Sequence, residues 1–179
     1  PPSIDPVHLS FADAGYRLAV VATGGDHADL TPDYAAVPVE MKAVAESLGS
    51  ETLASTPPEA LFADLTSLRE RNGDRALLRA MHFHDETRRA ADFTDAARGG
   101  DVDMIIALMN QSGSSSWRLL QNVHVDRDAT TQPMAVALAL TERFLRDNGA
   151  TGACRVHGGG FAGTILVVIP DSRFDDYKE

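Results

Sequence analysis

Cysteine and aromatic residues are both scarce in this sequence. Cys154 is the one cysteine among the 179 residues, which excludes an internal disulfide and a Cys-x-x-Cys metal site. This cysteine usage is typical of a reducing compartment, so we expect a cytoplasmic protein. Hydrophobic residues make up 44% of the chain but aromatic residues only 6%, so the core is expected to consist mainly of Ala, Leu and Val.

Long apolar runs and excess basic charge are also missing. No apolar run approaches the roughly 20 residues of a membrane-spanning helix, and no signal peptide is visible. Asp and Glu number 26 against 16 Lys and Arg, which gives a net charge of −10. Because so acidic a chain repels phosphate backbones and anionic lipid, we expect no nucleic-acid partner and no membrane partner.

The chain begins with Pro1 and not with Met. We interpret this as a natural N-terminus removed by processing, or as a piece excised from a longer protein. The length indicates one domain, or one domain with a fragment of another.

Hydrophobic patterning predicts strands at both ends of the chain and helices between them. The apolar run from Leu18 to Ala22 predicts a buried strand at 16–22. Apolar periodicity, capping residues and Gly or Pro boundaries predict the other elements, which are helices at 31–48, 58–71, 74–98, 102–112 and 133–147 and strands at 152–156 and 164–169. This segregation favours an α+β fold in which helices cover one face of a small antiparallel sheet.

Local signals refine these helices. Thr31 and Asp101 are typical helix caps, and Pro32 suits a first helical position. Ser112–Ser116 lacks the sequence context of a nucleophile, so we interpret it as a polar helix end. The first predicted helix carries a rough stripe, formed by Ala36, Val39 or Glu40, Ala43 and Leu48.

A glycine-rich loop separates the last two predicted strands. Gly158, Gly160 and Gly163 satisfy G-x-G-x-x-G, but the following residues predict a strand, whereas a dinucleotide site requires a helix there. No lysine follows Gly163, which excludes a Walker A loop. Two interpretations stay open: a hairpin loop of unusual geometry, or a loop whose backbone approaches a ligand or an anion.

At this loop the sequence resembles the third motif of GHMP kinases, in its galactokinase form. The resemblance is carried by residues 152–168, GACRVHGGGFAGTILVV, and extends over most of residues 16–170. Other matching stretches follow in family order: Ala22–Leu30 with Asp33-Tyr34, Arg79-Ala80-Met81-His82 with Glu86-Thr87-Arg88, and Leu108-Met109-Asn110-Gln111-Ser112. The departures are His157 and Ala162 in the loop, and the stretch Gln121–His124, which fits the family pattern poorly.

The resemblance implies a fold and a domain. Residues 1–179 would form the ferredoxin-like C-terminal domain of a GHMP kinase. Residues 1–30 would include a strand that pairs with the missing N-terminal domain of the same chain and leaves a sheet edge exposed where that domain is absent.

The resemblance also implies an activity. Galactokinases transfer the γ-phosphoryl group of ATP, with Mg²⁺, to the anomeric hydroxyl of galactose. Tyr34 would contact the sugar, and Gly158, Gly159 and Gly160 would shape the loop near the phosphates. We expect no catalytic residue and no metal ligand in these 179 residues, with Mg²⁺ and ATP held mainly by the missing half, so the chain alone should be inactive.

Three other functions remain open at this stage. One is a kinase for another sugar, the second is a catalytically silent sugar sensor on the same fold, and the third is a small ligand-binding α+β domain.

Several polar residues have a structural and a functional interpretation. Arg155 would form an ion pair or reach a phosphate. Packing or turn formation is expected for the remaining candidates, Asp26, His27, Asp29, His82, His84 and Cys154.

Overall fold

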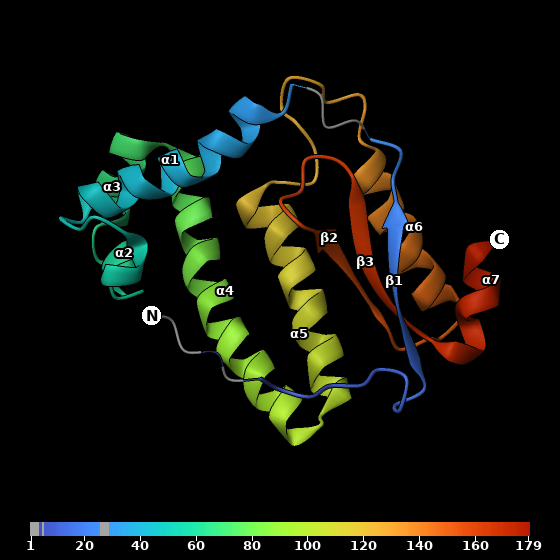
Figure 1. Ribbon diagram of the computed structural model, residues 1–179. Helices are drawn as coiled ribbons and strands as arrows, with labels where there is room; N and C mark the ends of the chain where they lie inside the picture. Colours follow the sequence, from blue (N-terminus) through green and yellow to red (C-terminus); the bar gives the residue numbers. More distant parts are fainter. Residues whose placement is uncertain (1–3, 5, 26–28) are drawn as a thin grey trace.

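Helices and a small sheet make up the computed structural model, which describes residue 4, residues 6–25 and residues 29–179 (Figure 1). The three strands of this described part are β1 (Tyr16–Ala22), β2 (Ala153–His157) and β3 (Thr164–Pro170). Its seven α-helices are α1 (Thr31–Ser47), α2 (Ala60–Ala63), α3 (Leu65–Asn72), α4 (Asp74–Gly99), α5 (Val102–Ser115), α6 (Pro133–Asp147) and α7 (Phe174–Lys178). Short 3₁₀ turns lie at Leu53–Ser55 and Asp171–Arg173, and a π-helical turn at Ser116–Leu120 continues α5.

The strands form one antiparallel sheet in the order β1-β3-β2. The first and last strands along the described chain are therefore neighbours, with Leu18 opposite Val168 and Val20 opposite Leu166. The α+β fold predicted from the sequence is confirmed.

Helices cover both faces of this sheet. α5 packs against β2 on one face, and α6 packs against β2 and β3 on the other. Alternate residues of β3 divide between the two sides: Ile165 and Val167 join the core beneath α6, while Val168 joins the core beneath α5. The prediction that helices cover one face only is therefore wrong. The sequence shows that β3 is apolar throughout, which is the expected pattern for a strand buried on both faces.

β1 is an edge strand, and the prediction that it is buried is wrong. Leu18 and Val20 are 52% and 56% exposed, although Ala19 and Val21 pack against the α6 side of the core. The cause is the position of α5, which lies over β2 and leaves the β1 end of that face open (Figure 1). Among the described residues β1 pairs with β3 alone.

A second core joins α1, α3 and α4 into a helical unit away from the sheet. Val44, Ala45, Leu61, Leu68 and Ala80 are buried in it. The apolar stripe predicted for α1 is confirmed only in part: Leu48 packs against this core, but Val39 is 65% exposed and the buried side runs through Val44 and Ala45. The single helix predicted at 58–71 is divided into α2 and α3 at Asp64.

The helix ends explain how the longest elements meet. Asp101 caps α5 as predicted, because its side chain accepts a hydrogen bond from the backbone N–H of Met104 at 2.9 Å. Thr31 is the first residue of α1 and makes no side-chain cap. α5 ends at Ser115, within the predicted Ser112–Ser116, but a π-helical turn continues from it, and Ser112, Ser115 and Ser116 are buried. No helix in the described part of the chain is long and apolar enough to span a membrane.

Candidate functional site

Tyr34 and the glycine loop meet, although they are far apart in the sequence. Tyr34 lies in the first turn of α1, and the loop joins β2 to β3. The Tyr34 hydroxyl donates a hydrogen bond to the carbonyl oxygen of Gly160 at 2.9 Å. Two parts of the predicted site therefore form one structural unit.

The glycines are required by this close approach. A Cβ added at Gly159 would lie 2.7 Å from Cε1 of Tyr34, so the tyrosine ring fills the space that a side chain would need. Gly160 has a φ of +84°, which disfavours any other residue, and a Cβ there would overlap the carbonyl oxygen of Asn122. Phe161 follows with its ring edge against Tyr34, at a centroid distance of 5.4 Å. These contacts favour a specifically shaped loop over a plain hairpin.

Asn122 holds the loop from the other side, and sequence reasoning missed it. Its side-chain Nδ2 donates to the carbonyl oxygen of Gly159 at 3.0 Å. Its backbone carbonyl oxygen accepts a hydrogen bond from the backbone N–H of Phe161. Asn122 is 3% exposed. The only signal in the sequence was that Gln121–His124 departs from the family pattern.

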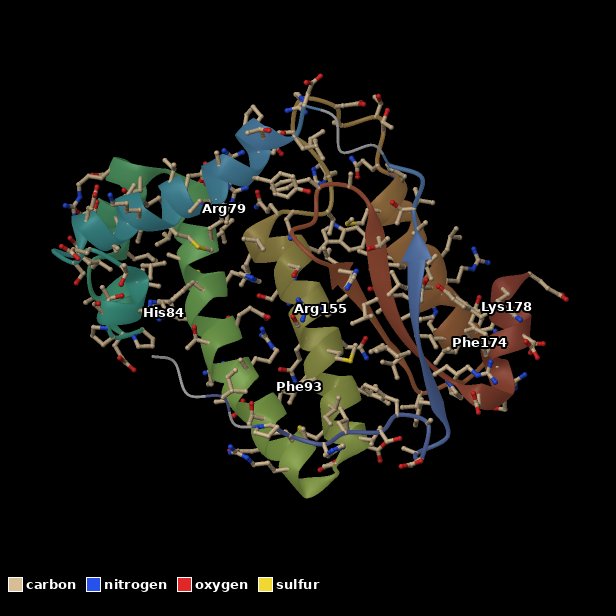
Figure 2. The ribbon with its side chains drawn as sticks, in the orientation of Figure 1. Arg79, His84, Phe93, Arg155, Phe174 and Lys178 are labelled. Atoms are coloured by element: carbon tan, nitrogen blue, oxygen red, sulfur yellow. The ribbon has the colours of Figure 1, made fainter. Side chains whose placement is uncertain are left out.

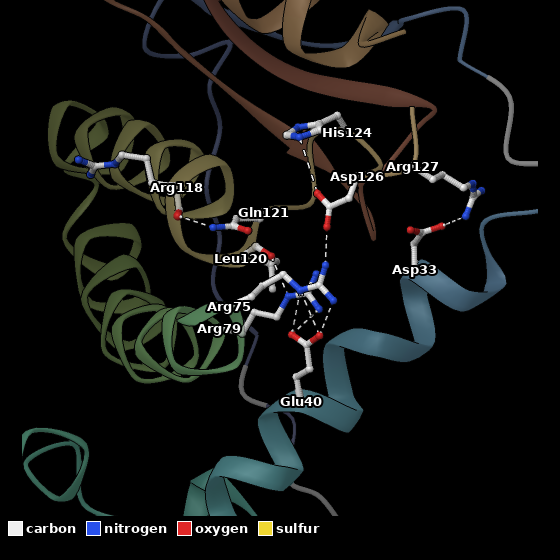
Figure 3. Close-up of polar contacts among 10 residues, drawn as sticks. All are labelled: Asp33, Glu40, Arg75, Arg79, Arg118, Leu120, Gln121, His124, Asp126 and Arg127. Carbon is white, nitrogen blue, oxygen red and sulfur yellow. Dashed lines mark hydrogen bonds and ion pairs between the residues drawn. The ribbon is translucent and has the colours of Figure 1, made fainter. Parts of the chain in front are cut away.

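An ion-pair network around the buried Arg79 attaches α1 to α4 (Figure 3). The carboxylate of Glu40 pairs with Nη2 of Arg75 at 2.5 Å and with Nη1 of Arg79 at 2.8 Å. Arg79 is 2% exposed, and its Nε donates to the carbonyl oxygen of Leu120 at 3.1 Å. Arg75 also pairs with Asp126, which lies in the loop that follows Asn122.

The electrostatics of the two arginines differ because their burial differs. Burial lowers the pKa of Arg79, and the charge of Glu40 opposes that shift. Hydrogen bonding to Glu40 raises the pKa of the more exposed Arg75. Glu40 is therefore the charge that compensates the buried Arg79 guanidinium, and the network is scaffold that orients α1.

The segment between the π-helical turn and α6 is attached to the start of α1. The guanidinium of Arg127 pairs with the carboxylate of Asp33 at 2.5 Å and donates to the carbonyl oxygen of Asp29 at 2.8 Å (Figure 3). Asp26 and His27, which the sequence offered as polar loop residues, lie outside the described residues. The position of Tyr34 therefore depends on contacts at both ends of the first half of α1.

The histidines of α4 have structural contacts. Nδ1 of His82 is hydrogen-bonded to Oγ of the buried Ser115 at 2.8 Å. Burial, followed by the charges of Arg89 and Arg155, lowers the pKa of His82 to about 4, so the imidazole is neutral near pH 7. Nε2 of His84 lies 3.4 Å from Oγ1 of Thr56. The packing interpretation of both histidines is confirmed.

The arginines of α4 and β2 differ in their pairing. Arg88 is exposed and pairs with Asp85, whereas Arg89 pairs with Glu86. Arg155 has no acidic partner among the residues described, so the predicted ion pair is absent from that part of the chain.

The described residues do not provide a set of ligands for Mg²⁺. Over residues 6–25 and 29–179, no three His, Cys, Asp or Glu side chains come close enough together to hold a metal ion. Phosphoryl transfer requires charge neutralisation at the phosphates. The backbone of the glycine loop can shape a binding surface, but this cluster of residues does not supply that neutralising charge.

Comparison with known proteins finds the same fold in a solved galactokinase. No family model matches the chain. The fold matches that of the Lactococcus lactis galactokinase solved in complex with galactose, with a TM-score of 0.72 and 20% identity, over 96% of this chain and 41% of that one.

Sequence comparison identifies the particular relatives as galactokinases. The chain is 24% identical to the galactokinase of Glaesserella parasuis over 92% of its own length and 40% of that protein. It is 31% identical to the galactokinase of Mannheimia succiniciproducens over 65% of its length and 27% of that protein. The chain is therefore homologous to galactokinases, as the motifs predicted, and spans about 40% of the length of the relatives that match most of it.

Proposed function

We propose that this chain is the C-terminal part of an ATP-dependent galactokinase, the enzyme that transfers the γ-phosphoryl group of ATP to the anomeric hydroxyl of galactose. The observation that carries the proposal is the contact between Tyr34 and Gly160, because it joins the two segments for which the resemblance implies sugar and phosphate contacts. Homology to galactokinases over 92% of the chain supports it.

The roles of the site residues follow from this proposal. Tyr34 contacts the sugar through its ring, since its hydroxyl is engaged by the loop. Gly158, Gly159 and Gly160 form the loop near the phosphates, and Asn122 holds that loop in position. Such a unit contributes to phosphoryl transfer mainly by holding the reacting groups in line.

The fold supports the proposal of a partial enzyme. The order β1, helices, β2, β3 and α7 follows most of the β-α-β-β-α-β pattern of ferredoxin-like domains. The exposed apolar residues Leu18 and Val20 at the sheet edge are a suitable surface for the N-terminal domain of a longer chain. In the proposal that domain supplies the catalytic residues, the Mg²⁺ ligands and most of the ATP site, and the whole protein is cytoplasmic.

The test is ADP release from Mg-ATP with galactose, measured on a galactokinase-length chain that contains these 179 residues. We expect turnover that depends on galactose, and none from the 179-residue chain alone. Tyr34→Ala in the longer chain should raise KM for galactose more than KM for ATP. The matched Tyr16→Ala variant should change neither KM.

The same assay separates the alternatives. Turnover with another hexose but not with galactose would keep the kinase and change the substrate. Binding of galactose without turnover by the longer chain, measured by calorimetry, would replace the kinase with a sugar sensor.

A further inference from the structure

A cavity of about 270 Å³ lies between α4, α5 and β2, on the side of β2 away from α6. Figure 2 shows Phe93 and Arg155 in the region where α4 and α5 face each other. Half of the lining is apolar and half is polar or charged, and it consists of Glu86, Arg89, Ala90, Phe93, Leu108, Met109, Ser112 and Arg155. Neither Tyr34 nor the glycine loop contributes to it.

The one carboxylate in the lining is already engaged. Glu86 pairs with Arg89 one turn further along α4. Its Oε2 also accepts a hydrogen bond from Oγ of Ser112 on α5 at 2.8 Å. Glu86 is therefore committed to α4 and α5.

The second guanidinium in the lining has no countercharge. The Nε of Arg155 donates to the carbonyl oxygen of Val156 at 3.2 Å, and no acidic residue in the described part of the chain pairs with it. Burial lowers the pKa of Arg155. Burial also lowers the pKa of Arg89; the charges of Asp85 and Asp92 oppose that shift, and the charge of Arg155 adds to it.

Among the residues that line the cavity, two guanidinium groups therefore accompany one carboxylate. The Nε of Arg89 is buried and makes no hydrogen bond within the described residues. A buried charge or donor without a partner is costly, so the lining would be stabilised by one additional negative charge with two acceptor oxygens. A carboxylate has this charge and geometry, and guanidinium groups bind it through paired hydrogen bonds.

We propose that this cavity binds a small monocarboxylate with a short apolar body. The carboxylate bridges the guanidinium groups of Arg89 and Arg155, and the body lies against Phe93, Leu108 and Met109. The lining carries one excess positive charge, and Asp85 and Asp92 act on Arg89 from outside it, so a monoanion is favoured over phosphate. This site is independent of the proposed kinase site.

The test uses sodium benzoate as the probe. It replaces sodium chloride in the buffer at constant ionic strength. Equilibrium dialysis of labelled benzoate and thermal unfolding of the 179-residue chain measure the same site in two ways. We expect saturable binding and a rise in the unfolding temperature. Benzyl alcohol, which lacks the charge, should not compete.

Variants assign the binding to this cavity. Arg155→Met should weaken benzoate binding at least tenfold and should not lower the unfolding temperature in chloride, because it removes an unpaired charge. Arg155→Lys, which keeps the charge but not the fork, should bind benzoate more weakly than the unchanged chain. The matched control is Arg143→Met on the exposed side of α6, which should bind as the unchanged chain does.

Three results would overturn the proposal. They are equal benzoate binding with and without Arg155, saturable binding of inorganic phosphate in the absence of benzoate binding, and a large loss of stability in Arg155→Met without ligand. The last result would mean that Arg155 is paired within the protein.

Discussion

Glu40 Oε2 lies 2.8 Å from Nη1 of Arg79, and this contact joins α1 to α4 across 39 residues of sequence. The two arginines that pair with Glu40 differ in their dependence on its carboxylate. Arg79 is 2% exposed and cannot recover hydration if the carboxylate is lost, whereas Arg75 is exposed enough to do so.

Replacing Glu40 with Gln should therefore leave a buried guanidinium charge uncompensated. Breaking a buried pair from one side costs about 3–5 kcal/mol, and we expect Glu40→Gln to lower the free energy of unfolding by that order. Urea unfolding followed by circular dichroism measures it. The matched control is Asp126→Asn, which removes a carboxylate from an exposed pair and should cost less than about 1 kcal/mol. Equal losses for the two variants would contradict the buried-pair interpretation.

The hydrogen bond from Tyr34 to the glycine loop makes a smaller contribution. Tyr34→Phe keeps the ring beside Gly159 and removes the hydroxyl that donates to Gly160, so the loss should be about 1 kcal/mol. Tyr34→Ala also empties the space beside the loop and should cost about 3 kcal/mol or more. Tyr16→Phe is the control, because no hydrogen bond to its hydroxyl is recorded within the described residues. If Tyr34→Phe proves as stable as the control, the loop does not depend on this bond.

Local sequence patterns predicted the long helices because their signals lie within the element. The predicted helix at 74–98 corresponds to α4, and the predicted helix at 133–147 corresponds to α6. Met134, Leu138 and Leu145 recur at helical spacing along α6 and are buried. An apolar stripe of this kind can be identified from the residues of the helix itself, without knowing which element covers it.

Sequence patterns failed to predict burial and contacts where these depend on which elements pack together. The apolar run of β1 predicted burial, but the open end of the sheet exposes Leu18 and Val20. Asn122 acquires its position from the glycine loop, 37 residues further along the chain, and no spacing rule connects them.

The exposed edge of β1 should promote association between copies of the isolated chain. An unpaired strand with apolar side chains is a template for pairing with another strand. We expect concentration-dependent association in sedimentation velocity experiments, and the double variant Leu18→Lys, Val20→Lys should reduce it. Val39→Lys alters an equally exposed apolar residue on α1 and should leave association unchanged. Association that survives the double variant would place the contact elsewhere.

His82 should make the protein sensitive to acid. Burial, with the nearby charges of Arg89 and Arg155, holds its pKa at about 4 in the folded chain, below the ordinary value of 6.5. The unfolded chain therefore binds the proton first as pH falls, so the contribution of neutral His82 to stability is complete above pH 6.5 and is lost progressively down to pH 4. The shift corresponds to about 3 kcal/mol.

His82→Gln tests this because the amide has no charge to gain in that range. The difference in unfolding free energy between the unchanged chain and His82→Gln should shift by about 3 kcal/mol, in favour of the variant, between pH 7 and pH 4. His157→Gln changes an exposed histidine and serves as the control. A pH-independent difference for His82→Gln would show that His82 is solvated in the folded protein.

Cys154 should be chemically inert in the folded protein. Its side chain is buried on β2, and burial raises the pKa of the thiol to about 12, so almost no thiolate is present near neutral pH. We expect a disulfide reagent such as dithionitrobenzoate to label Cys154 at pH 8 only as fast as the chain unfolds. In denaturing urea, labelling should be complete within seconds to minutes. Rapid labelling of the folded chain would show that the α6 side of the sheet opens locally, since α6 is what separates this thiol from solvent.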